Sequence, residues 1–395
     1  MATPKLRFPE FDENWNKQRL DNFLERVSNP VDVIADQQYT QIGIRSHGKG
    51  IFHKEAITGE ELGNKRVFWI EPNALIVNIV FAWERAIAVT SDAEKGMIAS
   101  HRFPMYLPKN NLSNVDFLRY FFLTDKGQTY LELASPGGAG RNKTLGQSNF
   151  AELKIDLPIL EEQTKITTFL SAVDEKISQL SQKLHFLGQY KQGMMQKLFS
   201  QQIRFKADDG SEFGVWEEKK LGEISTTFSG GTPKSTNKKF YQGTIPFIKS
   251  GEISQKHTEQ FINELALKES SAKLVKKGDL LYALYGATSG QVAISQIDGA
   301  INQAVLCIRS NLNTIYLLNF FLWKKDSILS TYLQGGQGNL SAAILKEIFV
   351  PVPCFKEQTQ IANFLYSIDQ KIDVVSEQLE QAKLWKKGLL QQMFV

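Results

Sequence analysis

The strongest constraint in this sequence is an internal repeat of about 200 residues. Residues 157–177, LPILEEQTKITTFLSAVDEKI, match residues 352–372, VPCFKEQTQIANFLYSIDQKI, at an offset of 195 residues. The same offset continues without a gap to Phe199 and Phe394. Each copy of a repeat must form the same supersecondary unit, so the repeat dictates the architecture. We therefore expect two half-molecules joined head to tail.

Both copies carry apolar residues at alternating steps of four and three, which is typical of a coiled-coil seam. No proline interrupts either run, and the seam breaks at Lys191 in one copy and at Lys386 in the other. An apolar stripe of this length needs a partner, and the nearest candidate is the other copy, in a parallel or an antiparallel pair. The alternative is that each helix packs on its own globular region. The seam residues expected to be buried are Ile166, Leu170, Ile177, Leu184, Ile361, Leu365, Ile372 and Leu379.

The remaining parts of the two halves are mixed in pattern. Short β-rich runs at 74–80 and 279–283 are bounded by turn residues, and apolar helical stretches follow at 115–124 and 314–329. The fold class is therefore α+β, with two globular domains separated by two long helices. The predicted boundaries are 1–157 for the first globular domain, 158–200 for the first helix, 201–352 for the second globular domain and 353–395 for the second helix.

Composition and motifs speak against several functional classes. The chain has two cysteines, a net charge of +4 and no run of apolar residues long enough for a membrane helix, so we expect a protein of the reducing cytoplasm. The stretch GGAGRNKT resembles a phosphate-binding loop, but Asn142 stands where that motif requires glycine. The histidines and cysteines lack metal-ligand spacing. We expect neither a catalytic site nor a bound metal or cofactor.

Two stretches, 42–54 and 229–251, combine basic and polar side chains without any acidic residue. Two glycine-rich stretches, 135–149 and 333–343, add amide side chains and, in the first stretch, two cations. Lysine and arginine side chains bind DNA phosphates, whereas arginine, glutamine and asparagine read base edges in the major groove. The alternative interpretation is that these stretches are ordinary solvated surface loops.

Taken together, the repeats and loops resemble the specificity subunit of type I restriction-modification systems. SGGTPKSTNKKFYQGTIPFIKSGEI (229–253) resembles the opening of a target-recognition domain of that family, and GDLLYALYGATSGQVAI (278–294) and INQAVLCIRS (301–310) follow in the family's order. The first half carries segments of a different subtype, IGIRSHGKGIFHKE (42–55) and IVFAWERAIAV (79–89).

The resemblance implies that each globular half reads one part of a bipartite sequence in double-stranded DNA. It also implies that the two helices pair antiparallel, set the unspecified gap between the half-sites and dock two methyltransferase (modification) subunits. S-adenosylmethionine, ATP and Mg²⁺ would be bound by those subunits and by the restriction subunits, which translocate and cleave DNA. A structural adaptor that bridges proteins without touching DNA, and a self-sufficient nuclease or methyltransferase, are the rival interpretations.

The residues expected to contact DNA lie in the basic and glycine-rich stretches and in the segments 79–89 and 278–294, with Arg102 as an addition outside them. In the first half they are Arg45, His47, Lys49, Arg85, Arg102, Arg141, Asn142 and Lys143. In the second half, Lys234, Lys238, Lys239 and Lys249 are expected on phosphates, and Tyr241, Ser250, Thr288, Gln291, Gln337 and Asn339 near base edges.

Overall fold

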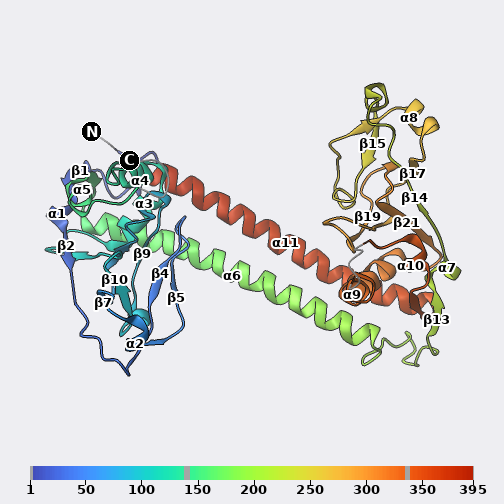
Figure 1. Cartoon of the computed structure of the whole chain (residues 1–395), viewed down its shortest axis with the longest axis horizontal. Coiled ribbons are helices and arrows are strands. Elements are labelled where there is room, and N and C mark those ends of the chain that lie inside the picture. Colours follow the sequence, from blue (N-terminus) through green and yellow to red (C-terminus); the bar gives the residue numbers. More distant parts are fainter. Residues whose placement is uncertain (1–2, 138–142, 334–338, 395) are drawn as a thin grey trace. The chain divides into compact units, whose positions relative to one another are not determined.

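The computed structural model describes residues 3–137, 143–333 and 339–394 (Figure 1). The chain divides into two compact units, and each contains parts of both long helices. Unit 1 comprises residues 1–181 and 377–395, and unit 2 comprises residues 182–376. The α+β class and the repeated architecture predicted from the sequence are confirmed.

The two long helices are α6 (Leu160–Phe199) and α11 (Phe355–Met393). Neither contains proline, and Glu161 and Glu162 lie in the first turn of α6, where negative charge favours the positive end of the helix dipole. A short strand ends just before each of them, β12 (Lys154–Leu157) before α6 and β22 (Phe349–Val352) before α11. The helices expected from the heptad pattern are thus confirmed.

The globular part of unit 1 is built from short strands and helices. Its central sheet has the order β2-β11-β8-β9, and β1 pairs antiparallel with β12. Three two-stranded sheets, β10-β7, β3-β6 and β4-β5, complete it. The strands are β1 (Asn16–Arg19), β2 (Leu24–Val27), β3 (Gln38–Tyr39), β4 (Ile42–Ile44), β5 (Ile51–His53), β6 (Ile57–Thr58), β7 (Val67–Trp69), β8 (Leu75–Val77), β9 (Ile87–Val89), β10 (Ile98–Ser100) and β11 (Met105–Pro108). The helices are α1 (Leu20–Phe23), α2 (Gly59–Leu62), η1 (Ala82–Glu84), η2 (Asp92–Glu94), α3 (Val115–Leu123), α4 (Asp125–Leu133) and α5 (Gln147–Glu152).

The globular part of unit 2 repeats this plan. The sheet β14-β21-β18-β19 has the same connection order as the central sheet of unit 1, and β13 pairs antiparallel with β22. A second sheet, β16-β15-β20-β17, contains one parallel pair, β15 with β20. The strands are β13 (Glu217–Lys220), β14 (Ser225–Ser229), β15 (Ile245–Ile248), β16 (Phe261–Ile262), β17 (Lys273–Val275), β18 (Leu280–Ala283), β19 (Val292–Ile294), β20 (Gly299–Ile301) and β21 (Val305–Ser310). The helices are α7 (Leu221–Ile224), η4 (Lys238–Tyr241), α8 (Glu264–Glu269), α9 (Thr314–Leu333) and α10 (Ala342–Lys346).

Each unit buries its own aromatic core. In unit 1, Phe117, Phe121 and Phe122 of α3 are fully buried with Leu170 of α6 and Leu389 of α11. In unit 2, the side chains of α9 occupy the equivalent place in the core, together with the last turns of α6 and the first half of α11. The long helices are therefore integral to both cores.

Candidate nucleic-acid interface

In both units the two long helices pack against each other along the predicted seam. In unit 1, Ile166 and Leu170 of α6 share a core with Leu389 and Met393 near the end of α11. In unit 2, the roles are exchanged, and the first half of α11 shares a core with the end of α6. The start of each helix thus lies beside the end of the other, so the pair is antiparallel in each unit. Of the predicted seam residues, Ile166, Leu170, Ile361, Leu365 and Leu379 are buried, and Ile177, Leu184 and Ile372 are partly buried.

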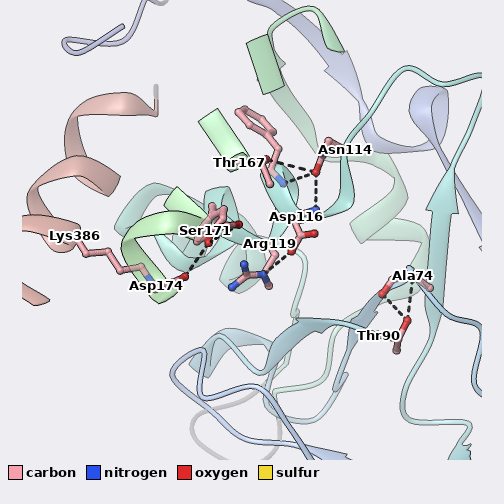
Figure 2. Close-up of polar contacts among 11 residues, drawn as sticks. Ala74, Thr90, Asn114, Asp116, Arg119, Thr167, Ser171, Asp174 and Lys386 are labelled. Carbon is pink, nitrogen blue, oxygen red and sulfur yellow. Dashed lines mark hydrogen bonds and ion pairs between the residues drawn. The ribbon is translucent and has the colours of Figure 1, made fainter. Parts of the chain in front are cut away.

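The two lysines that interrupt the seam form ion pairs between the helices. Lys386 of α11 contacts Asp174 of α6 in unit 1, as Figure 2 shows. Lys191 of α6 lies 2.6 Å from Asp369 of α11 in unit 2. Asp174 and Asp369 are themselves repeat equivalents, so one interaction is made twice with the helices exchanged. The residue numbers of the two partners add to the same total in both pairs, as an antiparallel register requires.

In unit 1 this ion pair is connected to the globular part. The hydroxyl of Tyr120 on α3 donates to Asp174 at 2.8 Å. Asn114 caps α3 by accepting from the backbone amides of Asp116 and Phe117 (Figure 2). The side chain of Gln163 on α6 accepts from the backbone amide of Asn114 at 2.8 Å. These contacts hold the start of α3 against α6.

A buried glutamate at the start of each long helix holds the segment that precedes the globular part. Glu162, whose side chain is 1% exposed, accepts from the guanidinium of Arg7 at 2.7 Å and from the indole of Trp15 at 3.2 Å. The hydrogen bonds to Glu162 raise the pKa of Arg7, against the smaller opposing effect of burial. In unit 2, Glu357 accepts in the same way from Arg204 at 2.8 Å and from the indole of Trp216. Trp15 and Trp216 thus play the same part in the two units, each binding the buried glutamate of its unit.

Three residues expected to contact DNA lie in the β4–β5 hairpin of unit 1. Arg45, His47 and Lys49 are exposed. The guanidinium carbon of Arg45 lies 4.6 Å from the centre of the Phe52 ring, which supports its side chain. His47 has a left-handed backbone with φ of 60°. The hairpin thus brings these three residues together on one exposed turn.

The other first-half candidates are distributed around the same unit. Arg85 is half-buried and donates to Asp125 at 2.7 Å, whereas Arg102 is exposed in the turn before β11. Lys143 lies over the ring of Trp83, with its Nζ 5.6 Å from the ring centre. Arg141 and Asn142 lie outside the described residues.

Helix α11 brings further cations to this face, which the sequence did not predict. Lys383, Lys386 and Lys387 line a pocket together with His47 and Arg85. The pocket lies within unit 1, between the last turns of α11 and the loops after β4 and before β9. A signal was present in the repeat, because α6 has glycine and glutamine where α11 has Lys383 and Lys387. The sequence alone did not show that these lysines lie next to the β4–β5 hairpin, because that contact joins distant segments of the chain.

In unit 2, the candidate lysines surround η4. Lys234, Lys238 and Lys239 are exposed on the segment that ends in this short helix. Tyr241 is half-buried, and its hydroxyl donates to the backbone carbonyl of Pro233 at 2.7 Å, which fixes the segment. Because that hydroxyl already has a partner, Tyr241 can support the lysines more readily than it can read a base.

The remaining second-half candidates lie at two other loops. Lys249 and Ser250, both partly exposed, follow β15, whereas Thr288 and Gln291 belong to the turn between β18 and β19. The backbone amide of Gln291 donates to the carbonyl of Thr288 at 3.0 Å, and the Gln291 side chain is exposed. Asn339 is exposed, and Gln337 lies outside the described residues.

The described parts of the chain contain side chains that can ligate metals, and two cysteines. Within residues 3–137, 143–333 and 339–394, no three histidine, cysteine, aspartate or glutamate side chains could hold a metal ion together. Cys307 is buried, and burial raises the pKa of its thiol to about 12. Nor do the helices of those three ranges combine the length and apolar character that a membrane span requires.

Comparison with known proteins agrees with this architecture. The family model described as type I restriction modification DNA specificity domain matches residues 54–185 and, a second time, residues 214–384. The type I restriction enzyme MjaVIII specificity subunit of Methanocaldococcus jannaschii is 25% identical, over 98% of this chain and 92% of the relative. The EcoR124I/EcoR124II specificity subunit of Escherichia coli is 24% identical over 62% of this chain and 63% of its own length.

Solved structures share the fold over the whole length of the chain. The S subunit of a type I restriction-modification system from M. genitalium covers 100% of this chain and 99% of its own, with a TM-score of 0.63 and 17% identity. The HsdS subunit from Thermoanaerobacter tengcongensis covers 97% of both chains, with a TM-score of 0.52 and 19% identity. The two-domain plan inferred from the repeat is therefore a fold that solved proteins share.

Proposed function

This chain belongs to the family of type I restriction modification DNA specificity domains, and we propose that it is the DNA-recognition and scaffold subunit of a type I restriction-modification complex. Each globular part reads one half of a bipartite sequence in double-stranded DNA, and α6 with α11 sets the gap between the half-sites. The observation that carries this proposal is the twofold repetition of one structural frame with different exposed loops. Recognition of two different half-sites requires different base-contacting loops, and these can be carried on the same scaffold.

The loops that differ between the units support the assignment of the readers. Unit 1 presents Arg45, His47 and Lys49 on a hairpin, whereas unit 2 presents Lys234, Lys238 and Lys239 around η4. Lysine and arginine would bind phosphates at both places, and the polar side chains around them would read bases. An adaptor that bridges only proteins would not need clusters of exposed cations in both globular parts.

The partners in this proposal are two modification subunits and, through them, the restriction subunits. Tyr190 on α6 and Trp385 on α11 are repeat equivalents, and both are about half exposed, at 51% and 54%. Exposed aromatic residues are enriched at protein interfaces. Two equivalent aromatic positions on an antiparallel pair suit two copies of one partner, because both copies meet the same local surface.

The chain itself is proposed to be non-catalytic and to act in the cytoplasm. S-adenosylmethionine would be used by the modification subunits, and ATP with Mg²⁺ by the restriction subunits. Incubation of the purified chain with DNA, Mg²⁺ and S-adenosylmethionine should give neither cleaved nor methylated DNA. Product formed by the chain alone would favour a self-sufficient nuclease or methyltransferase instead.

The decisive experiment is methylation-site sequencing in cells that carry the intact system. We expect a split motif with a fixed gap, and exchange of residues 205–352 for those of another family member should change one half of it only. A change in both halves would contradict independent reading. A gel-shift titration against salt provides the second test, because DNA binding should weaken steeply as salt rises. The absence of any shift at low salt would favour the protein-bridging adaptor.

A further inference from the structure

A basic pocket in unit 1 joins the end of α11 to the β4–β5 hairpin. Its volume is about 290 Å³, and it is lined by His47, Gly48 and Arg85 on one side and by lysines of α11 on the other. Of the described residues that line it, Asp125 is the only acidic one. A concave site with this charge attracts an anion.

The loop side of the pocket is held in a demanding backbone conformation. His47 and Arg85 both have a left-handed backbone with φ of 60°, which side chains other than glycine adopt at a cost of about 1 kcal/mol. Two hydrogen bonds join these loops, from the amide of His47 to the carbonyl of Glu84 at 2.7 Å and from the amide of Gly48 to that of Arg85 at 3.0 Å. A side chain at position 48 would collide with Leu123, since a Cβ there would lie 2.4 Å from its Cδ2. The fold thus fixes His47 and Arg85 at the mouth of the pocket.

The helix side supplies cations that the helix pair does not use. Lys383, Lys387 and Gln391 are spaced by four residues and so lie on one face of α11. Lys386 points instead to Asp174 of α6 (Figure 2). Lys383 pairs with Glu380, but both side chains are at least half exposed, so this pair contributes little stability. No acidic partner is found for Lys387 among the described residues.

We propose that this pocket binds backbone phosphates of DNA, so that the end of α11 belongs to the DNA-binding surface as well as to the spacer. In the hairpin, the pocket residues His47 and Gly48 lie between the exposed cations Arg45 and Lys49 in the sequence, and residues 42–54 contain no acid. This run of basic residues favours a nucleic acid over an acidic protein segment as the occupant. This inference rests on the proposed function, since it adds phosphate contacts to the same recognition surface.

The proposed phosphate site is present in unit 1 but has no equivalent in unit 2. The residues of α6 equivalent to Lys383 and Lys387 are Gly188 and Gln192, which carry no charge. Unit 2 therefore cannot form the same site with its helix. Binding of the half-site read by the first globular part should therefore include more contacts to DNA phosphates. Its affinity should depend more strongly on salt concentration.

The test compares the full chain with its Lys383→Gln/Lys387→Gln variant, in which the second change installs the residue of the other copy. Binding is measured at several KCl concentrations, on a duplex that carries the sequenced motif and on one with both half-sites scrambled. The variant should bind both duplexes about tenfold more weakly at low salt, and the slope of log K against log [KCl] should become shallower by about two. The ratio of the two affinities should not change, because phosphate contacts carry no sequence information.

Lys371→Gln is the matched control, since this exposed lysine of α11 belongs to unit 2 and does not line the pocket. It should leave the affinity and the salt slope as they are. If the wild-type chain discriminates the motif but the double variant keeps the wild-type salt slope, the phosphate site is refuted and the proposed function is not. Loss of binding to the modification subunits with unchanged DNA affinity would also overturn the phosphate site and identify a protein-docking surface. Failure of the wild-type chain to shift either duplex at low salt would instead refute the proposed function.

Discussion

Glu162 in unit 1 and Glu357 in unit 2 are repeat equivalents, and each is buried beneath an arginine and a tryptophan. The interhelical lysine–aspartate pair is likewise present in both units. The exposed parts differ, since unit 1 has the β4–β5 hairpin and unit 2 has the lysine-rich segment before η4. The buried contacts that hold the frame are thus the same in both copies, while the exposed surfaces proposed to bind DNA differ.

Even equivalent positions of the frame are not in equal surroundings. Leu379 of α11 is 6% exposed, whereas its equivalent on α6, Leu184, is only partly buried. Tyr120 follows the N-cap of α3 by six residues, and Asn319 is the residue six positions after the N-cap of α9 in unit 2. In unit 1, Tyr120 donates to Asp174. The side chain of Asn319 donates to the carbonyl of Ile315 instead. Substitutions at equivalent positions should therefore reveal where the symmetry holds and where it fails.

The largest expected effect is at the buried glutamates. Glu162→Ala leaves the guanidinium of Arg7 without its partner and should destabilise unit 1 by about 3 kcal/mol, and Glu357→Ala should do the same to unit 2. Hydrogen exchange read separately in the two units measures both effects. Glu161→Ala, at an exposed neighbour in the same helical turn, should cost less than about 1 kcal/mol. If one variant accelerated hydrogen exchange equally in both units, the two glutamates would not stabilise their units separately.

The next effect distinguishes the two leucines of the seam. Leu379→Asp places a charge at a buried position and should cost about 3 kcal/mol, whereas Leu184→Asp should cost roughly half as much. Both should prevent copurification of the chain with modification subunits, since the helix pair is the proposed docking surface. Leu→Met at either position keeps the volume and should leave assembly intact. Normal assembly with Leu379→Asp would refute the role of this helix pair as the scaffold.

The seam could be predicted because a heptad pattern needs only residues close together in the sequence. The sequence also located the lysines that interrupt it, but Asp174 and Asp369 became their partners only once the helix direction was known. Contacts such as that of Arg7 with Glu162 join segments distant in the sequence, so no local pattern reports them. The same holds for Lys387 and His47, whose proximity depends on how α11 packs against the first globular part.

Smaller effects are expected at the interhelical ion pairs, where the two units should differ. Lys191→Met leaves Asp369 without its lysine and should cost about 1 kcal/mol in unit 2. Lys386→Met should cost less in unit 1, because Asp174 keeps the hydrogen bond from Tyr120. Double-mutant cycles with Asp369→Asn and Asp174→Asn measure the two coupling energies. Equal losses for the two lysine variants would mean that Tyr120 does not compensate.

The last effect, of similar size, concerns acid sensitivity in unit 2 alone. Burial raises the pKa of Asp279, but hydrogen bonds from the Arg309 side chain and the Lys276 amide outweigh it, so the pKa lies below its usual range. A carboxylate with a lowered pKa stabilises the folded state at neutral pH, and this contribution is lost as the pH falls through that lowered pKa. Asp279→Asn should thus cost about 1 kcal/mol at pH 7 and make unit 2 less sensitive to acid below about pH 4. Hydrogen exchange at both pH values should show no change in unit 1, and an equal loss at pH 7 and pH 3 would rule out ionisation of Asp279 as the cause.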